Sequence, residues 1–174
     1  MLRSVSLAAM PPDDSVVGAL LACHDRIRRF AAMAVAVAAR PDAPAGERAE
    51  AAAGVVRYFT IALPLHAADE DESIGPRLRG VDAVRAELAA EHRAHDALIA
   101  PVVAACRAIV AAPTTARPDF AAAAAALTAA MATHLAREEA MVFPAVAALP
   151  PAIQAEIRAE MLARRDPTAA PSRP

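Results

Sequence analysis

Aromatic residues and glycine are scarce in this chain of 174 residues, and lysine is absent. There is no Trp, one Tyr and five Gly, so aromatic residues make up 3% of a sequence that is 57% hydrophobic. Alanine accounts for the difference, with 52 residues. Alanine is the strongest helix former, whereas sheets need more β-branched and aromatic residues. The composition therefore excludes sandwiches, barrels and doubly wound α/β folds, and favours one domain of closely packed helices.

The charge pattern and the weak apolar runs exclude several classes of partner. The net charge is −2, and the 18 basic residues are all arginines scattered among acids without a basic stripe. We therefore expect no nucleic-acid binding. The alanine runs are too weakly apolar to span a bilayer, and the apolar part of the N-terminus is too short for a signal peptide. We expect a cytoplasmic protein that makes no membrane contact.

Only two cysteines are present, Cys23 and Cys106, and they do not form a Cys-x-x-Cys pair. Two thiols in a chain of this size do not make a disulfide framework. We expect both to be small buried side chains that do not pair with each other.

Proline and glycine divide the chain into five predicted helical stretches, at about 16–40, 45–78, 83–112, 118–149 and 151–165. Ser15 or a preceding Asp caps the first, and Pro64 and Pro101 are expected to kink the second and third. Pro118 suits the first position of the fourth.

These stretches predict an all-α fold, an antiparallel up-down-up-down four-helix bundle with a short C-terminal fifth helix. The bundle domain is expected to span residues 13–165, between an N-terminal extension, 1–12, and a disordered tail, 166–174. The fifth helix either caps the bundle or forms a homodimer contact, and the sequence leaves both open.

Each of the four long stretches carries histidine on its apolar face, the face that points inward. Glutamate follows two of these histidines by four residues, which places each pair on one helix face, one turn apart. Buried carboxylates without positive partners would be costly, and a cation among them removes that cost. The pattern predicts a metal site, and the alternative is a hydrogen-bonded polar core. The predicted ligands are His24, His66, Glu70, His92, His134 and Glu138.

The spacing of these ligands repeats along the chain. His24 and His92 are 68 positions apart, as are His66 and His134, and Glu70 and Glu138. The residues around each also correspond, which indicates a tandem duplication of a helix pair. A bundle built in this way has approximate twofold symmetry about its long axis, and that symmetry suits two metal ions better than one.

These residues resemble the hemerythrin-like family, also called HHE cation-binding domains. The resemblance covers residues 13–149 and rests on four motifs: Cys-His24-Asp, Tyr-Phe-x4-Pro-Leu-His66-x3-Glu70, Glu-His92 and His134-x3-Glu138-Glu-x3-Phe-Pro. It implies an antiparallel four-helix bundle that holds two non-heme iron ions with an oxo or hydroxo bridge. Carried over to this chain, Glu70 and Glu138 would bridge the irons, and the four histidines of the motifs would be terminal ligands.

The chain departs from the hemerythrins proper in three places. They carry His-x3-His on the third helix and His-x4-Asp on the fourth, where this chain has His92-x2-His95 and His134-x3-Glu138. The Phe-Pro that commonly follows the second-helix motif is Gly75-Pro76 here. The resemblance is therefore to the broader family rather than to an oxygen carrier.

The ligand count affects the function that this resemblance implies. With four terminal histidines and two bridging glutamates, each iron would keep one open or solvent position, whereas a fifth histidine would fill one of the two. The resemblance implies a protein that binds, senses or scavenges O2, NO or peroxide. Two alternatives stay open: a di-iron redox enzyme, oxidase-like or peroxide-decomposing, and an iron-handling or structural metal bundle.

The roles of two further residues stay open. The repeat maps His92 onto His24 and His95 onto Ile27, so we expect His92 to be the main third-helix ligand. His95 is then an extra ligand, a donor that orients a carboxylate, or plain core. Tyr58 is a candidate proton donor or an ordinary core residue.

Several acidic residues flank the predicted ligands. Asp69, Asp71, Glu72 and Glu139 are expected on a solvated face or around the ligands. Asp25 and Glu91 adjoin ligand histidines but point about 100° away from them on a helix.

Overall fold

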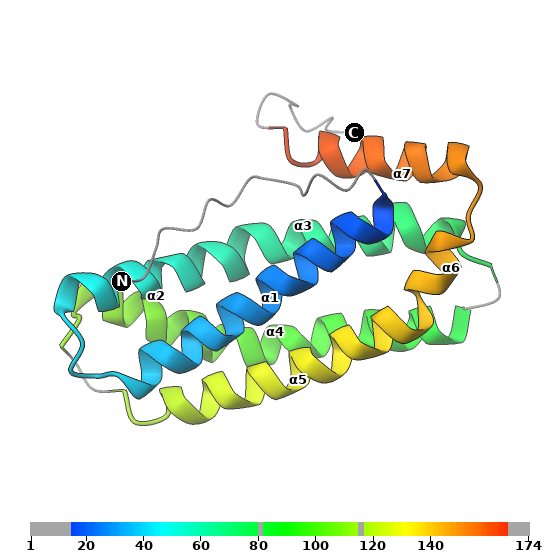
Figure 1. Ribbon diagram of the computed structural model, residues 1–174. Coiled ribbons are helices and arrows are strands. Elements are labelled where there is room, and N and C mark those ends of the chain that lie inside the picture. Colours follow the sequence, from blue (N-terminus) through cyan, green and yellow to red (C-terminus); the bar gives the residue numbers. More distant parts are fainter. Residues whose placement is uncertain (1–14, 80–81, 115–116, 167–174) are drawn as a thin grey trace, which may run out of the picture.

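The computed structural model describes residues 15–79, 82–114 and 117–166, and this part of the chain is helical and has no strand (Figure 1). The all-α fold class is thus confirmed. The expected N-terminal extension, 1–12, and residues 167–174 of the expected tail lie outside the described residues. Both cysteines are buried and free, as predicted.

The first and third stretches closely match their predicted bounds. Helix α1 runs over Val16–Ala39, and the Ser15 side chain caps it by accepting a hydrogen bond from the Gly18 N–H at 2.9 Å. Helix α4 runs over Asp82–Ala111 and continues through Pro101 as one α-helix.

The second stretch is not the regular α-helix that spacing predicts. Its elements are α2 (Ala45–Arg57), a π-helical turn η1 (Tyr58–Ala62), α3 (Leu63–Ala68), a second π-helical turn η2 (Asp69–Ile74) and a 3₁₀ turn η3 (Gly75–Arg77). In η1 the Leu63 N–H donates to the Tyr58 carbonyl five residues back, directly before Pro64. Proline lacks an N–H and crowds the preceding turn, so the wider π turn accommodates it.

The fourth stretch begins later than predicted and is divided. Helix α5 covers Phe120–Met141, and Pro118 lies in the turn before it rather than at its first position. A break at Val142 separates α5 from α6 (Phe143–Ala147), where Pro144 prevents the α-helix from continuing unchanged. Helix α7 (Pro151–Ala163) corresponds to the predicted fifth helix.

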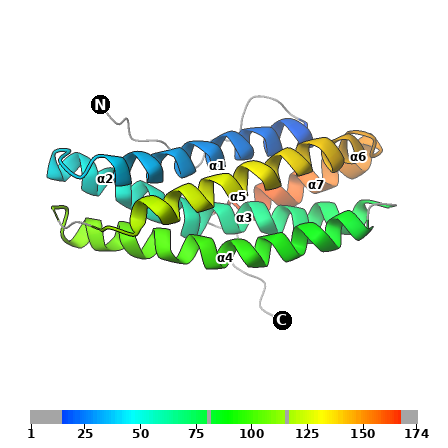
Figure 2. The same cartoon turned by 90° about the horizontal axis from the view of Figure 1, so that it is seen from below.

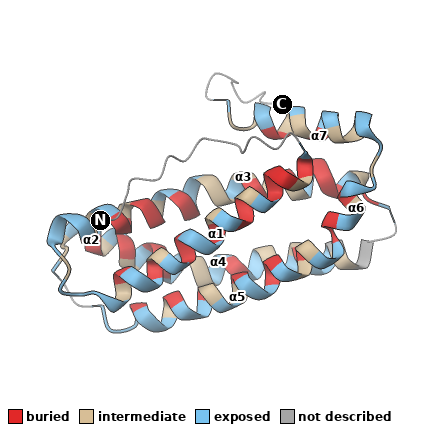
Figure 3. Cartoon of the chain, in the orientation of Figure 1, coloured by how far each residue is buried: buried red, intermediate tan, exposed pale blue. Residues whose placement is uncertain are grey.

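The long helices pack side by side in a bundle. Helix α1 contacts α2 and α5, and α4 contacts the same two helices, which places α1 and α4 on opposite corners (Figures 1 and 2). Helix α7 lies against η2 and the start of α1 at one end (Figure 1). Buried residues follow the inward faces of the helices, as Figure 3 shows.

The apolar core is divided into two clusters along the bundle. The larger cluster contains residues from Ile27 to Val37 on α1 together with the facing parts of α2, α4 and α5. The smaller cluster lies at the α7 end and includes Leu20, Leu88, Phe143 and Ile157. His24 on α1, His92 on α4 and Glu138 on α5 fall between the residues of the two clusters, and His134 lies at the edge of the larger one, so a polar layer separates two apolar regions.

By length and composition alone, two helical stretches reach the hydropathy of a membrane span, Ala45–Arg77 and Ala86–Ala111. The sequence expectation was that the alanine runs are too weakly apolar to span a bilayer, whereas these two stretches, which include other apolar residues, reach that hydropathy. Core helices of a soluble bundle pass the same test, and both stretches are bundle elements here.

Candidate metal centre

Six histidine and glutamate side chains from the four long stretches meet between the two apolar clusters. Most are almost fully buried, and the least buried, His92, exposes 16% of its side chain. We call them the ligand cluster: His24 on α1, His66 on α3, Glu70 on η2, His92 on α4, and His134 and Glu138 on α5.

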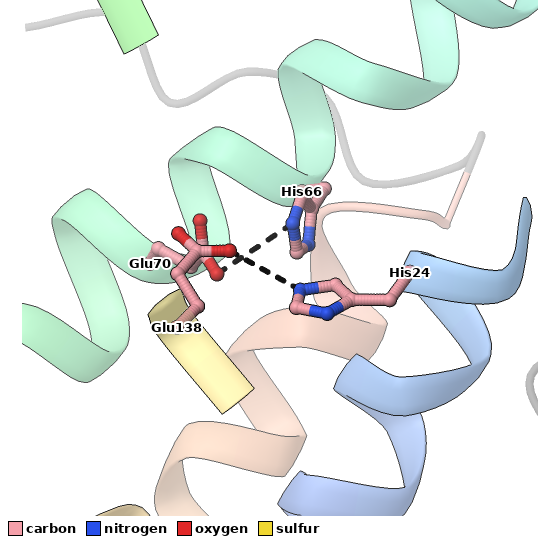
Figure 4. A group of neighbouring side chains, drawn as sticks. All are labelled: His24, His66, Glu70 and Glu138. Carbon is pink, nitrogen blue, oxygen red and sulfur yellow. Dashed lines mark ion pairs between the residues drawn. The ribbon is translucent and has the colours of Figure 1, made fainter. Parts of the chain in front are cut away.

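Two subsets of this cluster could each hold a cation. Ligand atoms of His24, His66, Glu70 and Glu138 all lie within 4.8 Å of one another, as do those of His92, His134 and Glu138 (Figure 4 shows the first subset). Glu138 belongs to both subsets. The structure therefore brings together all six residues that the sequence predicts as ligands.

The two carboxylates lie between two pairs of histidines. Glu138 Oε2 is 3.3 Å from His24 Nε2, and Glu138 Oε1 is 3.0 Å from His134 Nε2 and 3.6 Å from His92 Nε2. Glu70 Oε1 is 3.5 Å from His66 Nε2, and Glu70 Oε2 is 3.3 Å from His92 Nε2. Each carboxylate thus reaches both histidine pairs, one pair with each of its oxygens, and Glu138 contacts both members of the second pair.

These contacts follow the repeat of 68 positions. The contact between His24 and Glu138, at 3.3 Å, corresponds to that between His92 and Glu70, also at 3.3 Å. The rings of His24 and His66 have centroids 5.2 Å apart, and those of His92 and His134 are 4.8 Å apart. The approximate twofold symmetry inferred from the sequence is present in the side-chain geometry.

The cluster contains buried polar atoms that the protein itself does not satisfy. The Nε2 atoms of His24 and His66, both carboxylate oxygens of Glu70 and Oε2 of Glu138 are buried without a hydrogen-bond partner. Buried polar groups in folded proteins are nearly always hydrogen-bonded, and leaving them unpaired costs free energy. Imidazole nitrogen and carboxylate oxygen are ligand atoms for iron and other transition metals, so cations fit this donor set.

Burial and mutual contacts shift the pKa values of these groups in different directions. Burial lowers the pKa of His66 to about 3, so its ring is neutral and able to bind a metal. Burial, together with the charge of Glu138, raises the pKa of Glu70 to about 7. For His92, burial is outweighed by the nearby carboxylates of Glu138 and Glu70, which raise its pKa to about 10. For Glu138, burial is outweighed by the three histidines close to it, which lower its pKa.

Comparison with known proteins agrees with this geometry. Residues 15–146 match the hemerythrin HHE cation-binding domain. The chain belongs to this family. A comparison with curated proteins gave no match. The match includes all six residues of the ligand cluster and ends before α7.

Two histidines of the HHE domain have a hydrogen-bonded acidic partner on their second ring nitrogen, and His92 has an acid nearby without a hydrogen bond. His134 Nδ1 is 2.7 Å from Glu91, which also pairs with Arg137, and His24 Nδ1 is 2.8 Å from Glu139. His92 Nδ1 has a longer contact, 3.7 Å, with Asp71. Such partners fix the orientation of a ligand imidazole and raise its basicity.

Sequence reasoning missed the role of Glu91. It adjoins His92 in the chain and points away from it, as predicted, but that direction leads to the histidine of the neighbouring helix α5. His66 has no such partner, and its Nδ1 is buried without a hydrogen bond.

His95 lies beside the ligand cluster rather than within either subset. Its ring packs edge-on against that of His134, with centroids 4.7 Å apart, and the residue is 7% exposed. Burial, together with the nearby His134 and His92, lowers its pKa, so the ring is neutral at pH 7.

Tyr58 is a core residue of the HHE domain. Its ring stacks on Phe30 with centroids 4.2 Å apart, and its hydroxyl donates to the backbone carbonyl of Cys23 at 3.5 Å. Burial raises its pKa. Through Cys23, Tyr58 supports the helical turn that carries His24.

Helix α7 holds the turn that carries Glu70. Asp69, which is 0% exposed, pairs with Arg164 at 2.8 Å and with Arg165 at 2.5 Å, and both arginines follow α7 directly. Arg164 also donates to the Ser73 hydroxyl at 2.7 Å. The sequence placed Asp69 among flanking acids, because nothing local to η2 indicates two arginines almost a hundred residues later.

A cavity of about 410 Å³ reaches the ligand cluster between α3 and α4. Three ligand histidines and His95 line it, together with apolar residues such as Phe59 and Met131 and charged residues such as Asp96. The cavity therefore brings open space to the rings of His66, His92 and His134.

Proposed function

We propose that this HHE domain holds two iron ions in the ligand cluster and that the iron pair binds, senses or scavenges O2, NO or peroxide. Glu70 and Glu138 would bridge the ions, and His24, His66, His92 and His134 would be terminal ligands. The observation that carries the proposal is the position of Glu138, whose oxygens lie 3.3 Å from His24 and 3.0 Å from His134. A carboxylate between two histidine pairs suits two cations, whereas structural zinc prefers a single closed site with four ligands.

The chain's own residues prepare the site for such a pair. The up-down-up-down order that we infer for the bundle brings one histidine from each long stretch to the same level. Glu91 and Glu139 would hold the imidazoles of His134 and His24 in the orientation that binds. When bound, the iron pair would supply the redox chemistry and the affinity for O2, NO or peroxide.

Anaerobic loading with Fe(II) tests this proposal. We expect about two iron ions per chain by metal analysis and, after exposure to air, absorption in the near-ultraviolet. Glu138→Gln should lose at least one iron, because that carboxylate serves both subsets. Glu50→Gln removes the same charge at an exposed position on α2 and is the matched control. A single zinc ion in a tetrahedral site, with no second metal, would contradict the proposal.

A redox enzyme, oxidase-like or peroxide-decomposing, is the second candidate function. The cavity of about 410 Å³ favours it, because turnover needs a route to the centre for substrate and water. Adding peroxide in excess separates the candidates: an enzyme consumes many equivalents, whereas a protein that binds, senses or stoichiometrically scavenges peroxide reacts with about one per iron pair.

A further inference from the structure

A second cavity, of about 250 Å³, lies on the other side of His92 from the larger one. Glu70, His92 and Glu138 of the ligand cluster form one part of its wall. Most of the rest is apolar, and its residues come from η2, η3, α4 and the end of α5: Ile74, Leu78, Ala86, Leu88, Ala89 and Val142. Asp71, with half of its side chain exposed, also lines the cavity and pairs with His92.

The internal repeat explains why this space is open. Gly75 lines the cavity, and the residue 68 positions later is Phe143. In that half of the bundle the Phe143 ring is buried and packs on His24, with ring centroids 4.9 Å apart and planes at 37°. His92 is the counterpart of His24, and Gly75 has no ring to place beside it as Phe143 is placed beside His24.

The volume and the lining indicate what would fill this space. An apolar cavity of about 150 Å³ is enough for benzene, so 250 Å³ exceeds the needs of a diatomic gas. An anion would face the carboxylates of Glu70 and Glu138 without a compensating donor, and would lose its hydration against Leu78, Leu88 and Val142. A neutral apolar molecule of one ring meets neither cost.

We propose that the cavity left by Gly75 binds a small neutral apolar organic molecule, about the size of a substituted benzene ring, against His92 and the two bridging carboxylates. This inference deepens the proposed function, because it names the class of substrate or effector that the centre receives together with O2, NO or peroxide. The bound ring would take the place beside His92 that the Phe143 ring takes beside His24.

Toluene is the probe, because it reproduces the phenylalanine side chain. Its binding is measured by the methyl signals of ¹³C-labelled metal-free protein and, in parallel, by the near-ultraviolet spectrum of iron-loaded protein. We expect saturable binding that perturbs Val142 and Leu88. Gly75→Phe should weaken binding at least tenfold, because Gly75 lines the cavity and an added ring would compete with toluene for it. The backbone of Gly75 is helical, with φ −51° and ψ −49°, a conformation that any residue adopts.

Gly46→Phe is the matched control, because a side chain at this exposed position on α2 meets no atom within 4 Å. It should bind toluene as the unmodified protein does. If Gly75→Phe fails to fold, Ala89→Leu narrows the same cavity, and Ala97→Leu at an exposed position of α4 is its control.

Absence of saturable binding, or equal binding by the filled variants and their controls, would overturn the inference. The two proposals can fail separately. Two irons per chain without toluene binding would refute only the cavity ligand. Toluene binding that depends on Gly75, in a protein that holds no iron pair, would refute only the di-iron function.

Discussion

His92 and His95 are three residues apart on α4 and differ in what their rings contact. Both rings pack edge-on against that of His134, but only His92 also reaches the carboxylates, with Nε2 3.3 Å from Glu70 and 3.6 Å from Glu138. We expect His92→Ala to lose one iron or the near-ultraviolet band. His95→Ala should keep both irons with a shifted spectrum, since loss of a residue around the ligands typically costs about 10–100-fold in affinity. Metal analysis of both variants decides which histidine is the ligand on α4. The reverse result would show that it is His95.

The raised pKa of His92 predicts how metal affinity depends on pH. With a folded pKa of about 10, His92 carries a proton at neutral pH in the metal-free protein, and a metal must displace it. Fe(II) affinity should therefore keep rising between pH 7 and 9, by about tenfold per unit for this proton. Competition with a chelator under anaerobic conditions, repeated at each pH, measures this affinity. A plateau above pH 7 would indicate that His92 titrates like an ordinary histidine.

The same shift predicts the stability of the metal-free protein. The pKa of His92 is raised from 6.5 to about 10 on folding, so its stabilising contribution is complete below pH 6.5 and is lost as the pH rises through 10. Burial also raises the pKa of Glu70 from 4.5 to about 7, so the free energy of unfolding also falls as the pH rises from 4.5 to 7. The melting temperature of the metal-free protein should therefore fall as the pH is raised from 7 to 10. Iron loading should make this decrease smaller.

Helical spacing was enough to find the ligand cluster, because every member faces inward on its own helix and the repeat gives each a counterpart. The acids that contact the cluster from outside could not be found in this way. Glu91 and Asp69 act on residues of other helices, and their roles depend on how those helices are rotated against each other. The cavity beside His92 was not predicted either. Its signal in the sequence is Gly75, which stands where the other half of the repeat has Phe143.

At the scale of the element, α7 and η2 form one polar unit. Asp69 of η2 is fully buried between Arg164 and Arg165, and Arg77 pairs with Glu160 of α7 at 2.6 Å. Since η2 carries Glu70, these contacts fix the backbone on which a predicted bridging ligand stands. The helix lies outside the part of the chain that matches the HHE family, so this support comes from beyond the matched residues.

Removing both arginines tests this support. Arg164→Ala with Arg165→Ala leaves Asp69 buried without a cation, and we expect a loss of about 3–5 kcal/mol in the free energy of unfolding. Iron binding should weaken as well, because η2 loses its anchor. Adding Asp69→Asn to the same protein should restore part of the stability, because it removes the unpaired charge. Denaturant unfolding of the three proteins gives the values; no loss in the double variant would show that α7 holds its place through Ile157 and Met161 alone.

The π turns were the main departure of the elements from prediction. Apolar spacing over residues 45–78 fits an α-helix throughout, and proline was expected to bend it. The structure shows widened turns before Pro64 and Pro76, and the second widened turn includes Glu70. Spacing alone does not distinguish a kink from a wider turn, because both relieve the same crowding at proline.

At the scale of the whole molecule, two apolar clusters are separated by a layer of ionisable groups. Without metal this layer contains buried carboxylates and imidazoles with unsatisfied atoms, so it contributes less to stability than the clusters on either side. We expect amide hydrogen exchange in metal-free protein to be fastest, among the buried turns, in those that carry the ligand cluster. Iron loading should make these turns the slowest, and mass spectrometry of peptides measures both states. Equal protection along each helix in the metal-free state would contradict this picture.

The polar layer also brings together residues that are far apart in the chain. His24 and Glu138 are 114 positions apart and only 3.3 Å apart in space, so one ion bound by both would close a loop of most of the chain. A covalent cross-link over about 100 residues removes chain entropy from the unfolded state worth about 4–5 kcal/mol in the simplest model. Ions shared by four helical stretches would act as reversible cross-links of this kind. Unfolding of the loaded protein would then wait for metal release, and its rate would report how long the ions stay bound.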